Sequence, residues 1–114
     1  MPYYLFMRKN DAYDHFAEKR KSEERAEFMK RLRDAKNMAE AVLLYSDSVP
    51  PGHHLRPLYS NLGFFLMSNR APNGACKPEL EEYLRLMKAT EAENPDSLKS
   101  EIAAMEKAIL ERRF

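Results

Sequence analysis

Residues 10–46, NDAYDHFAEKRKSEERAEFMKRLRDAKNMAEAVLLYS, predict one long helix that is charged over its first two thirds and almost uncharged over its last. Unbroken, this helix would be about 54 Å long at about 1.5 Å per residue, whereas a compact domain of this size has a radius of gyration of about 13 Å. Asn10 or Asp11 can serve as the N-cap, because a short polar side chain accepts amide hydrogens of the first turn. The helix must therefore bend, break or project from the rest of the molecule.

Polar residues divide this helix into two parts. Residues 18–25, EKRKSEER, have no apolar face. An apolar stripe with spacings of four and three follows them, formed by Phe28, Leu32, Ala35, Ala39 and Val42. The rear part is therefore expected to pack against a core. We expect a break or an exposed turn near residues 21–24, and the alternative is a projecting arm that is offered to a partner.

Three further helices are predicted after this one. Turns rich in Pro, Gly and Asn separate the helices, at residues 49–57, 70–78 and 94–97. Residues 57–69 begin with a proline, which suits the first helical turn, and carry an apolar face. Residues 78–93 follow the i, i+3, i+4, i+7 template, and the last helix begins at Asp96 or Ser97. Because only a few residues join them, the last two helices should form an antiparallel hairpin.

The N-terminal residues 2–7, PYYLFM, are aromatic and apolar, a composition typical of β-strands. A single strand has no stability of its own, so we expect this segment to lie extended across the helices. The alternative is an α+β fold in which residues 2–7 pair with residues 62–67, LGFFLM. The sequence thus predicts an all-α fold, a small bundle of four to five helices with an extended aromatic N-terminal segment, in a single domain over residues 1–114.

The composition limits the class of protein. A chain of 114 residues can bury about two thirds of its unfolded surface and fold without disulfides or metals. The lone Cys76 cannot form an internal disulfide, and the short apolar start lacks the charge order of a signal peptide, so a cytoplasmic location is expected. No apolar run approaches the roughly 18 residues of a membrane span, and we expect no membrane partner.

Charge is spread unevenly along the chain. The formal net charge is +1, which argues against the overall basic balance of a dedicated nucleic-acid binder. Residues 1–36 carry ten Lys and Arg against seven Asp and Glu, whereas residues 72–114 carry seven against nine. This asymmetry would favour head-to-tail contact within or between chains, although solvated helix faces of mixed charge are the favoured explanation.

Few residues indicate metal binding. A zinc site needs about four converging ligands, and the chain has one Cys and three His. His53 and His54 are adjacent in a Pro-rich loop near Asp47, where a weak surface metal site is conceivable. An extended loop would direct the two rings to opposite sides, so we expect these histidines to cap backbone groups or face solvent. His15 is expected to be a half-buried packing residue.

Signs of catalysis are equally sparse. Cys76 is a possible reactive thiol, because it precedes Pro78 at the positive end of a helix, where the pKa of a thiol is lowered. No particular His is placed beside it by the sequence. Paired carboxylates fall on helices expected to be solvated, and the chain has no Gly-rich phosphate loop and no HExxH arrangement. We therefore expect no enzyme, no catalytic residue, no resident metal and no cofactor.

The interpretation that remains is a small non-enzymatic interaction, regulatory or adaptor protein. It would use the charged first helix and the aromatic, Met-rich middle segment to bind a protein partner or itself, with a homodimer favoured. The candidate contact residues are Tyr3, Tyr4, Phe6, Lys19, Arg20, Arg31, Phe64 and Met67. The alternative is a small nucleic-acid-binding regulator that uses the basic residues of the N-terminal third, although five acidic residues between positions 18 and 34 dilute their field.

Overall fold

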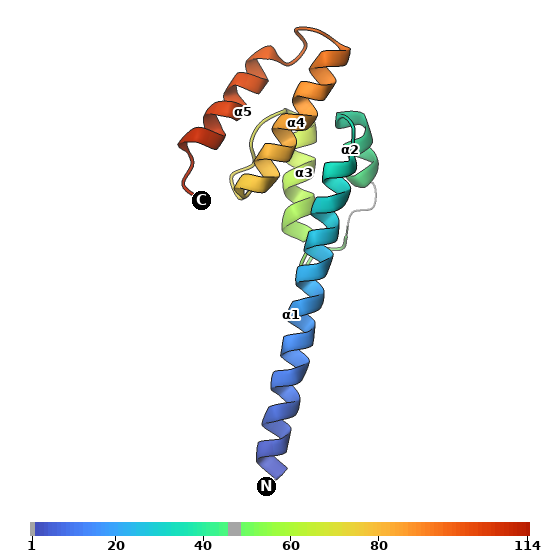
Figure 1. Ribbon diagram of the computed structural model, residues 1–114, viewed down its shortest axis with the longest axis vertical. Helices are drawn as coiled ribbons and strands as arrows, with labels where there is room; N and C mark the ends of the chain where they lie inside the picture. The colour runs from blue at the N-terminus through green and yellow to red at the C-terminus, as the bar shows by residue number, and fades with distance from the viewer. Residues whose placement is uncertain (1, 46–48) are drawn as a thin grey trace.

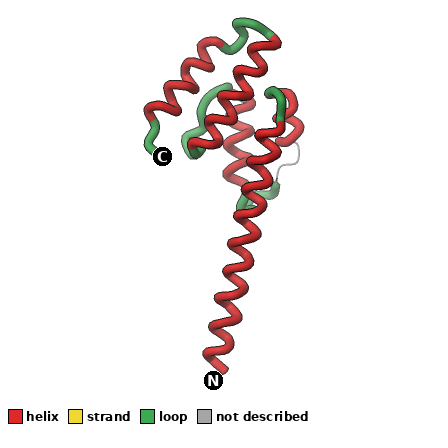
Figure 2. Tube along the Cα trace, viewed as in Figure 1, coloured by secondary structure: helices red, strands yellow, loops and turns green. Residues whose placement is uncertain are grey.

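The regular secondary structure of the described residues consists of helices. The computed structural model describes residues 2–45 and 49–114, with side chains described for residues 15–45 and 49–114. Its helices are α1 (Pro2–Asp34), α2 (Met38–Tyr45), α3 (Arg56–Ser68), α4 (Lys77–Glu93) and α5 (Lys99–Glu111). No strand occurs among the described residues (Figure 2). The predicted all-α bundle is confirmed.

The α+β alternative is wrong, because residues 62–67 lie inside α3. Their apolar residues are spaced for a helix that is buried along one face, and Leu62 and Phe65 are fully buried there. Residues 2–7 fall within the bounds of α1 rather than outside the first helix. Their side chains lie outside the described ones, so the predicted packing of this segment stays a prediction.

The helix ends of α3 and α4 follow from local sequence. Pro57 and Pro78 each stand in the first turn of their helix, where a missing amide hydrogen costs no hydrogen bond. Helix α3 ends at Asn69, which adopts a left-handed conformation with φ of 56° and donates its amide hydrogen to the Phe65 carbonyl at 2.8 Å. These signals explain why the predicted boundaries of both helices are close to the observed ones.

The core lies where α2, α3 and α4 meet the rear of α1, with α5 packed on α4 (Figure 1). The rings of Phe65 and Tyr83 stack at its centre, with centroids 4.4 Å apart and planes 10° from parallel. Around them the fully buried large side chains are Leu32, Leu62, Leu80, Leu86, Met87 and Met105. Helices α4 and α5 form the predicted hairpin, with Ile102 and Met105 of α5 buried.

The first break in the chain lies at residues 35–37, so the predicted break near residues 21–24 is wrong. Those residues are inside an uninterrupted α1. The guanidinium of Arg85 in α4 donates hydrogen bonds to the carbonyls of Leu32 at 3.0 Å and Ala35 at 2.9 Å. The Leu32 carbonyl also accepts the Ala35 amide hydrogen at 3.3 Å, and together these bonds supply partners at the helix end. Asn37 then accepts the Glu40 amide hydrogen at 3.0 Å and caps α2.

This break changes which side chains of the predicted stripe face the core. Phe28, Leu32 and Ala35 are buried as expected, but Ala39 and Val42 are exposed. Residues 35–37 shift the helical phase, and α2 instead buries Ala41 and Leu44. A stripe that is regular in the sequence therefore crosses two helices with different orientations.

The front of α1 projects from the other helices. We call residues 2–27 the arm and residues 28–34 the root, because Phe28 is the first buried residue among the described side chains of α1, which begin at residue 15. Figure 1 shows the arm extending alone beyond the bundle. The molecule measures 69 × 30 × 22 Å with a radius of gyration of 18.1 Å, well above the roughly 13 Å of a compact domain of this length. Of the two predicted alternatives, a bend and an arm, the structure has the arm.

Candidate functional site

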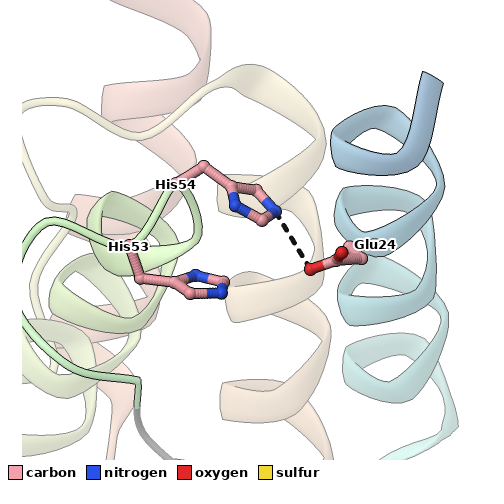
Figure 3. A group of neighbouring side chains, drawn as sticks. All are labelled: Glu24, His53 and His54. Carbon is pink, nitrogen blue, oxygen red and sulfur yellow. Dashed lines mark ion pairs between the residues drawn. The ribbon is translucent and has the colours of Figure 1, made fainter. Parts of the chain in front are cut away.

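Three side chains with metal-binding or proton-binding chemistry meet where the arm joins the root. Glu24 projects from α1, while His53 and His54 come from the loop before α3 (Figure 3). The Nε2 atom of His54 lies 3.0 Å from the Oε2 atom of Glu24. One potential ligand atom from each residue lies within 4.8 Å of the others. This cluster joins residues about thirty positions apart in the chain.

The loop sequence explains why both histidines point the same way. Gly52 has a φ of 87°, which a residue with a side chain rarely adopts, and it lets the chain turn tightly after Pro50 and Pro51. The His53 amide hydrogen is donated to the Pro50 carbonyl at 3.2 Å. The His53 and His54 rings consequently stack, with centroids 4.3 Å apart and planes 26° from parallel. The expectation that the rings point to opposite sides is wrong, because the loop is a turn and not extended.

Hydrogen bonds to the following helix hold this turn in place. The Leu55 amide donates its hydrogen to Nδ1 of His53 at 3.1 Å, and the Arg56 amide donates to the His53 carbonyl at 2.9 Å. The Leu55 side chain is buried in the core. The Arg56 guanidinium reaches back to the Val49 carbonyl at 3.1 Å. His53 therefore caps backbone as predicted, and its Nε2 atom is left to face the cluster.

The Nε2 atom of His54 is buried and makes no hydrogen bond to any described group. Its distance to Glu24 is short enough for an ion pair, but a 3.0 Å contact that is not a hydrogen bond is poorly aligned. The side chain of His54 is 20% exposed and that of Glu24 38%. A buried polar atom without a partner is uncommon in proteins and calls for an explanation.

A pocket of about 380 Å³ adjoins the cluster and includes His54 in its wall. Arg25 of α1, Asn61 of α3, and Cys76 and Glu79 at the start of α4 also line it. Met29, Leu58 and two prolines supply much of its apolar surface. The pocket therefore lies between the arm, the loop and the beginning of α4, and four of its polar residues can ionise.

Glu79 is the buried polar residue of this pocket, with 4% of its surface exposed. Its carboxylate accepts hydrogen bonds from Nδ2 of Asn61 at 3.0 Å, from the amide of Cys76 at 3.3 Å and from the hydroxyl of Tyr83 at 3.4 Å. Three donors compensate for the loss of water around it. We therefore assign Glu79 a structural role at the start of α4. The Cys-x-x-Glu spacing of a capping box is the sequence signal that could have identified it.

Burial raises the pKa of the Cys76 thiol above its ordinary value of 9.0, and Glu79 raises it further through a hydrogen bond and its charge. The backbone amide of Glu79 lowers the pKa, as expected at a helix start, but its effect is smaller. The expectation of a lowered pKa at Cys76 is thus wrong. Cys76 is exposed as a residue, but the partial burial of its thiol keeps the thiol protonated near neutral pH, which disfavours a reactive thiolate.

The residues predicted to contact a partner do not lie in the cluster of Glu24, His53 and His54. Lys19 and Arg20 are exposed on the arm and Arg31 is exposed on the root, whereas Phe64 and Met67 are exposed on α3. Tyr3, Tyr4 and Phe6 lie outside the described side chains, as does Asp47 near the histidine loop. His15 is exposed and not half-buried as predicted, because the arm has no neighbour to cover it. The sequence reasoning did not connect Glu24 with the two histidines.

No protein-family model, curated protein or solved structure matches the chain. Among the described residues, no helix combines the length and the apolar character needed to cross a membrane.

Proposed function

We propose that this protein is a non-enzymatic interaction protein in which the arm of α1 binds a second copy of the same chain. The observation that carries the proposal is the exposure of the arm. Among residues 15–27, only Ala17 and Glu24 are even partly covered, and Phe16 has 67% of its surface exposed. A long helix held out in this way presents a surface on every side to a partner.

Helix physics supports a partner for the arm. Isolated helices gain little from their own hydrogen bonds in water, and most helical stability in proteins comes from packing of an apolar face. The arm's described ion pairs within α1 are weak: Lys21 lies 3.6 Å from Glu18 and Arg20 lies 3.9 Å from Glu24, with largely exposed side chains. Exposed pairs of this kind contribute about 0.2–1 kcal/mol each. Association would cover Phe16 and supply the packing that the arm lacks in one chain.

An exposed apolar surface on α2 and α3 offers a docking site for the arm of the other copy. Phe64 and Met67, which are 49% and 89% exposed, are one helical turn apart and share a face of α3. Tyr45 of α2 lies against the backbone of Gly63, where an added Cβ atom would come within 2.8 Å of the Tyr45 ring. The residues Tyr45, Phe64 and Met67 thus form a docking surface that is apolar and accessible.

Charge complementarity favours a second copy over an unrelated partner. Residues 1–36 have an excess of three positive charges and residues 72–114 an excess of two negative charges. The arm points away from α4 and α5 in Figure 1, so these opposite charges are not brought together over the arm's length within one chain. Two chains arranged antiparallel about a two-fold axis would bring them together in a closed dimer.

Light scattering coupled to size exclusion tests the proposal over a range of protein concentrations. We expect a dimer whose mass falls to that of a monomer in the double variant Phe16→Ser, Met67→Ser. Phe114→Ser is the matched control, because Phe114 is a comparably exposed aromatic residue on neither surface. A wild-type chain that stays monomeric at every concentration would contradict the proposed self-association. Capture of a different protein by the arm would show that the arm binds that protein instead of a second copy.

Nucleic-acid binding is the second candidate, and the structure gives it weaker support. Lys19, Arg20 and Lys21 lie exposed on the arm, as a phosphate-binding surface requires. Arg20 and Lys21 are however paired with Glu24 and Glu18. Retention on heparin at moderate salt that disappears in the triple variant Lys19→Glu, Arg20→Glu, Lys21→Glu would favour this candidate.

A further inference from the structure

We propose that Glu24, His53 and His54 form a binding site for one divalent transition-metal ion such as Zn²⁺. The juxtaposition of one carboxylate and two imidazoles from α1 and the loop before α3 carries this inference. Two histidines and one glutamate are a known protein ligand set for zinc, with a fourth position left to water or another small ligand. The site is independent of the proposed self-association.

The distances in the cluster are close to those that a metal ion requires. Bond lengths of about 2.0–2.1 Å and a tetrahedral arrangement place neighbouring ligand atoms about 3.4 Å apart. The ligand atoms of the three residues already lie within 4.8 Å of one another. Rotation of partly exposed side chains is enough to close the remaining distance, because the Glu24 side chain is 38% exposed and is not held in a core.

The buried Nε2 atom of His54 is the second observation that points to a ligand. It has no hydrogen-bonding partner among the described groups, and Glu24 Oε2, 3.0 Å away, is poorly aligned with it. A metal ion between Nε2 and the carboxylate would be coordinated both by the lone pair of the nitrogen and by the negatively charged oxygen. The unsatisfied atom is then explained as a metal ligand.

His53 requires a local rearrangement to act as a ligand. In the structure its Nδ1 atom accepts the Leu55 amide hydrogen at 3.1 Å, so a neutral ring carries its own hydrogen on Nε2. Coordination through Nε2 moves the ring hydrogen to Nδ1, and the Leu55 amide must then give up this hydrogen bond. Metal binding is therefore expected to be coupled to a change in the turn at residues 53–55.

The adjoining pocket contains a group that opposes the cation. Arg25 lines the same pocket as His54, and its positive charge lowers the local affinity for any metal ion. Replacing Arg25 with Gln should therefore tighten metal binding. A bound ion would in turn link α1 to the loop before α3 and restrict the direction in which the arm leaves the bundle.

Titration calorimetry with ZnCl₂ on the full chain, freed of metal by a chelator, tests the site. We expect one ion per chain and a rise in melting temperature with added Zn²⁺. His54→Gln and Glu24→Gln should each weaken binding at least about tenfold. His15→Gln is the matched control, since His15 is an exposed histidine on the same helix outside the cluster, and it should bind like the wild type. Far-UV circular dichroism verifies that each variant is folded.

Two results would overturn the proposal. One is the absence of Zn²⁺ binding by a folded wild-type chain, and the other is binding that His54→Gln leaves unchanged. Amide spectra recorded by NMR provide an independent measurement, because the resonance of Leu55 should shift on addition of Zn²⁺ while that of His15 stays in place. Shifts confined to the acidic residues of α4 and α5 would instead show an adventitious ion.

Discussion

The arm and the root belong to one helix, but they are stabilised in different ways. In the root, Phe28 and Leu32 are buried to 3% and 0% exposure, and Arg85 provides hydrogen bonds for the last carbonyls. In the arm, the described side chains are almost all exposed, and apart from the contact of Glu24 with His54 their described ion pairs are with neighbours on the same helix. A continuous helix can therefore be held by tertiary packing at one end and mainly by local interactions at the other.

The difference shows where function can reside in this protein. Side chains of the root are packed in the core, so substitutions there should lower the free energy of unfolding. The arm contributes little to the core, so its sequence is free to serve contacts outside the chain. Glu24 lies at the boundary between the two, beside the histidine turn, where a bound ion would act on both.

The largest expected effect is in the root. Leu32→Ala removes a fully buried side chain and leaves a cavity, so it should lower the free energy of unfolding by about 2–5 kcal/mol. Phe16→Ala, on the arm, should change it by less than about 0.5 kcal/mol. Urea denaturation at a concentration where the protein is monomeric measures both. Equal losses would mean that the arm is packed against the bundle in solution.

The next largest loss of stability is expected when the hydrogen bonds at the end of the root are removed. Arg85→Ala removes the hydrogen bonds to the Leu32 and Ala35 carbonyls, and we expect a loss of about 1–3 kcal/mol in urea denaturation. Arg85→Lys is the informative comparison, because a lysine cannot donate to both carbonyls in the same fork geometry. A lysine variant as stable as the wild type would show that charge alone, and not the two hydrogen bonds, supports the break at residues 35–37.

A smaller effect comes from the buried Tyr83 of α4, which makes the free energy of unfolding depend on pH. Burial raises the pKa of Tyr83 above its ordinary value of 10.0, with a further contribution from Glu79. Below about pH 10 both folded and unfolded chains keep the phenol proton. Above it only the unfolded chain releases the proton, so the free energy of unfolding falls as pH rises.

Tyr83→Phe tests this dependence. The variant should lose about 0.5–1.5 kcal/mol near pH 8, because the hydrogen bond to Glu79 is removed. Its stability should then fall less steeply than that of the wild type between pH 10 and pH 11, since phenylalanine does not ionise. Urea denaturation across this range measures the two slopes, and parallel slopes would contradict a raised pKa at Tyr83.

The smallest effect is expected on the arm itself. Lys21→Ala breaks an exposed pair with Glu18 and should change the free energy of unfolding by less than about 0.5 kcal/mol. Hydrogen exchange provides the accompanying measurement for the isolated chain. Amides of residues 15–23 should exchange much faster than those of the root, because they open without disturbing the core. Protection of the arm that grows with protein concentration would instead report its association.

The helices were predictable where sequence signals agree. In α4, a proline in the first turn, apolar residues at Leu80, Tyr83 and Met87, and a stop before Pro95 all indicate the same helix. The break after α1 was not found, because the apolar spacing runs on through Ala39 and Val42 without a proline or glycine. Asn37 followed by Glu40 is a capping pattern that could have located it.

The candidate site was less accessible to sequence reasoning than the fold. His53 and His54 were recognised as potential ligands, but the turn made by Gly52 that stacks their rings was not foreseen. Glu24 was one of several acidic residues in a polar stretch, and nothing local connects it to a loop about thirty residues later. The raised pKa of Cys76 likewise depends on burial, which a helix-terminus argument does not include.

The sequence by itself determined the helical class, the ends of α3 and α4 and much of the core, because apolar spacing and capping are properties of short segments. Only the tertiary structure decided that α1 continues through residues 18–25 as an arm, that it ends where Arg85 can bind its carbonyls, and that Glu24 meets the two histidines. These features arise from contacts between segments that are far apart in the sequence. The free energies of such contacts depend on the folded arrangement and cannot be derived from a short stretch of residues.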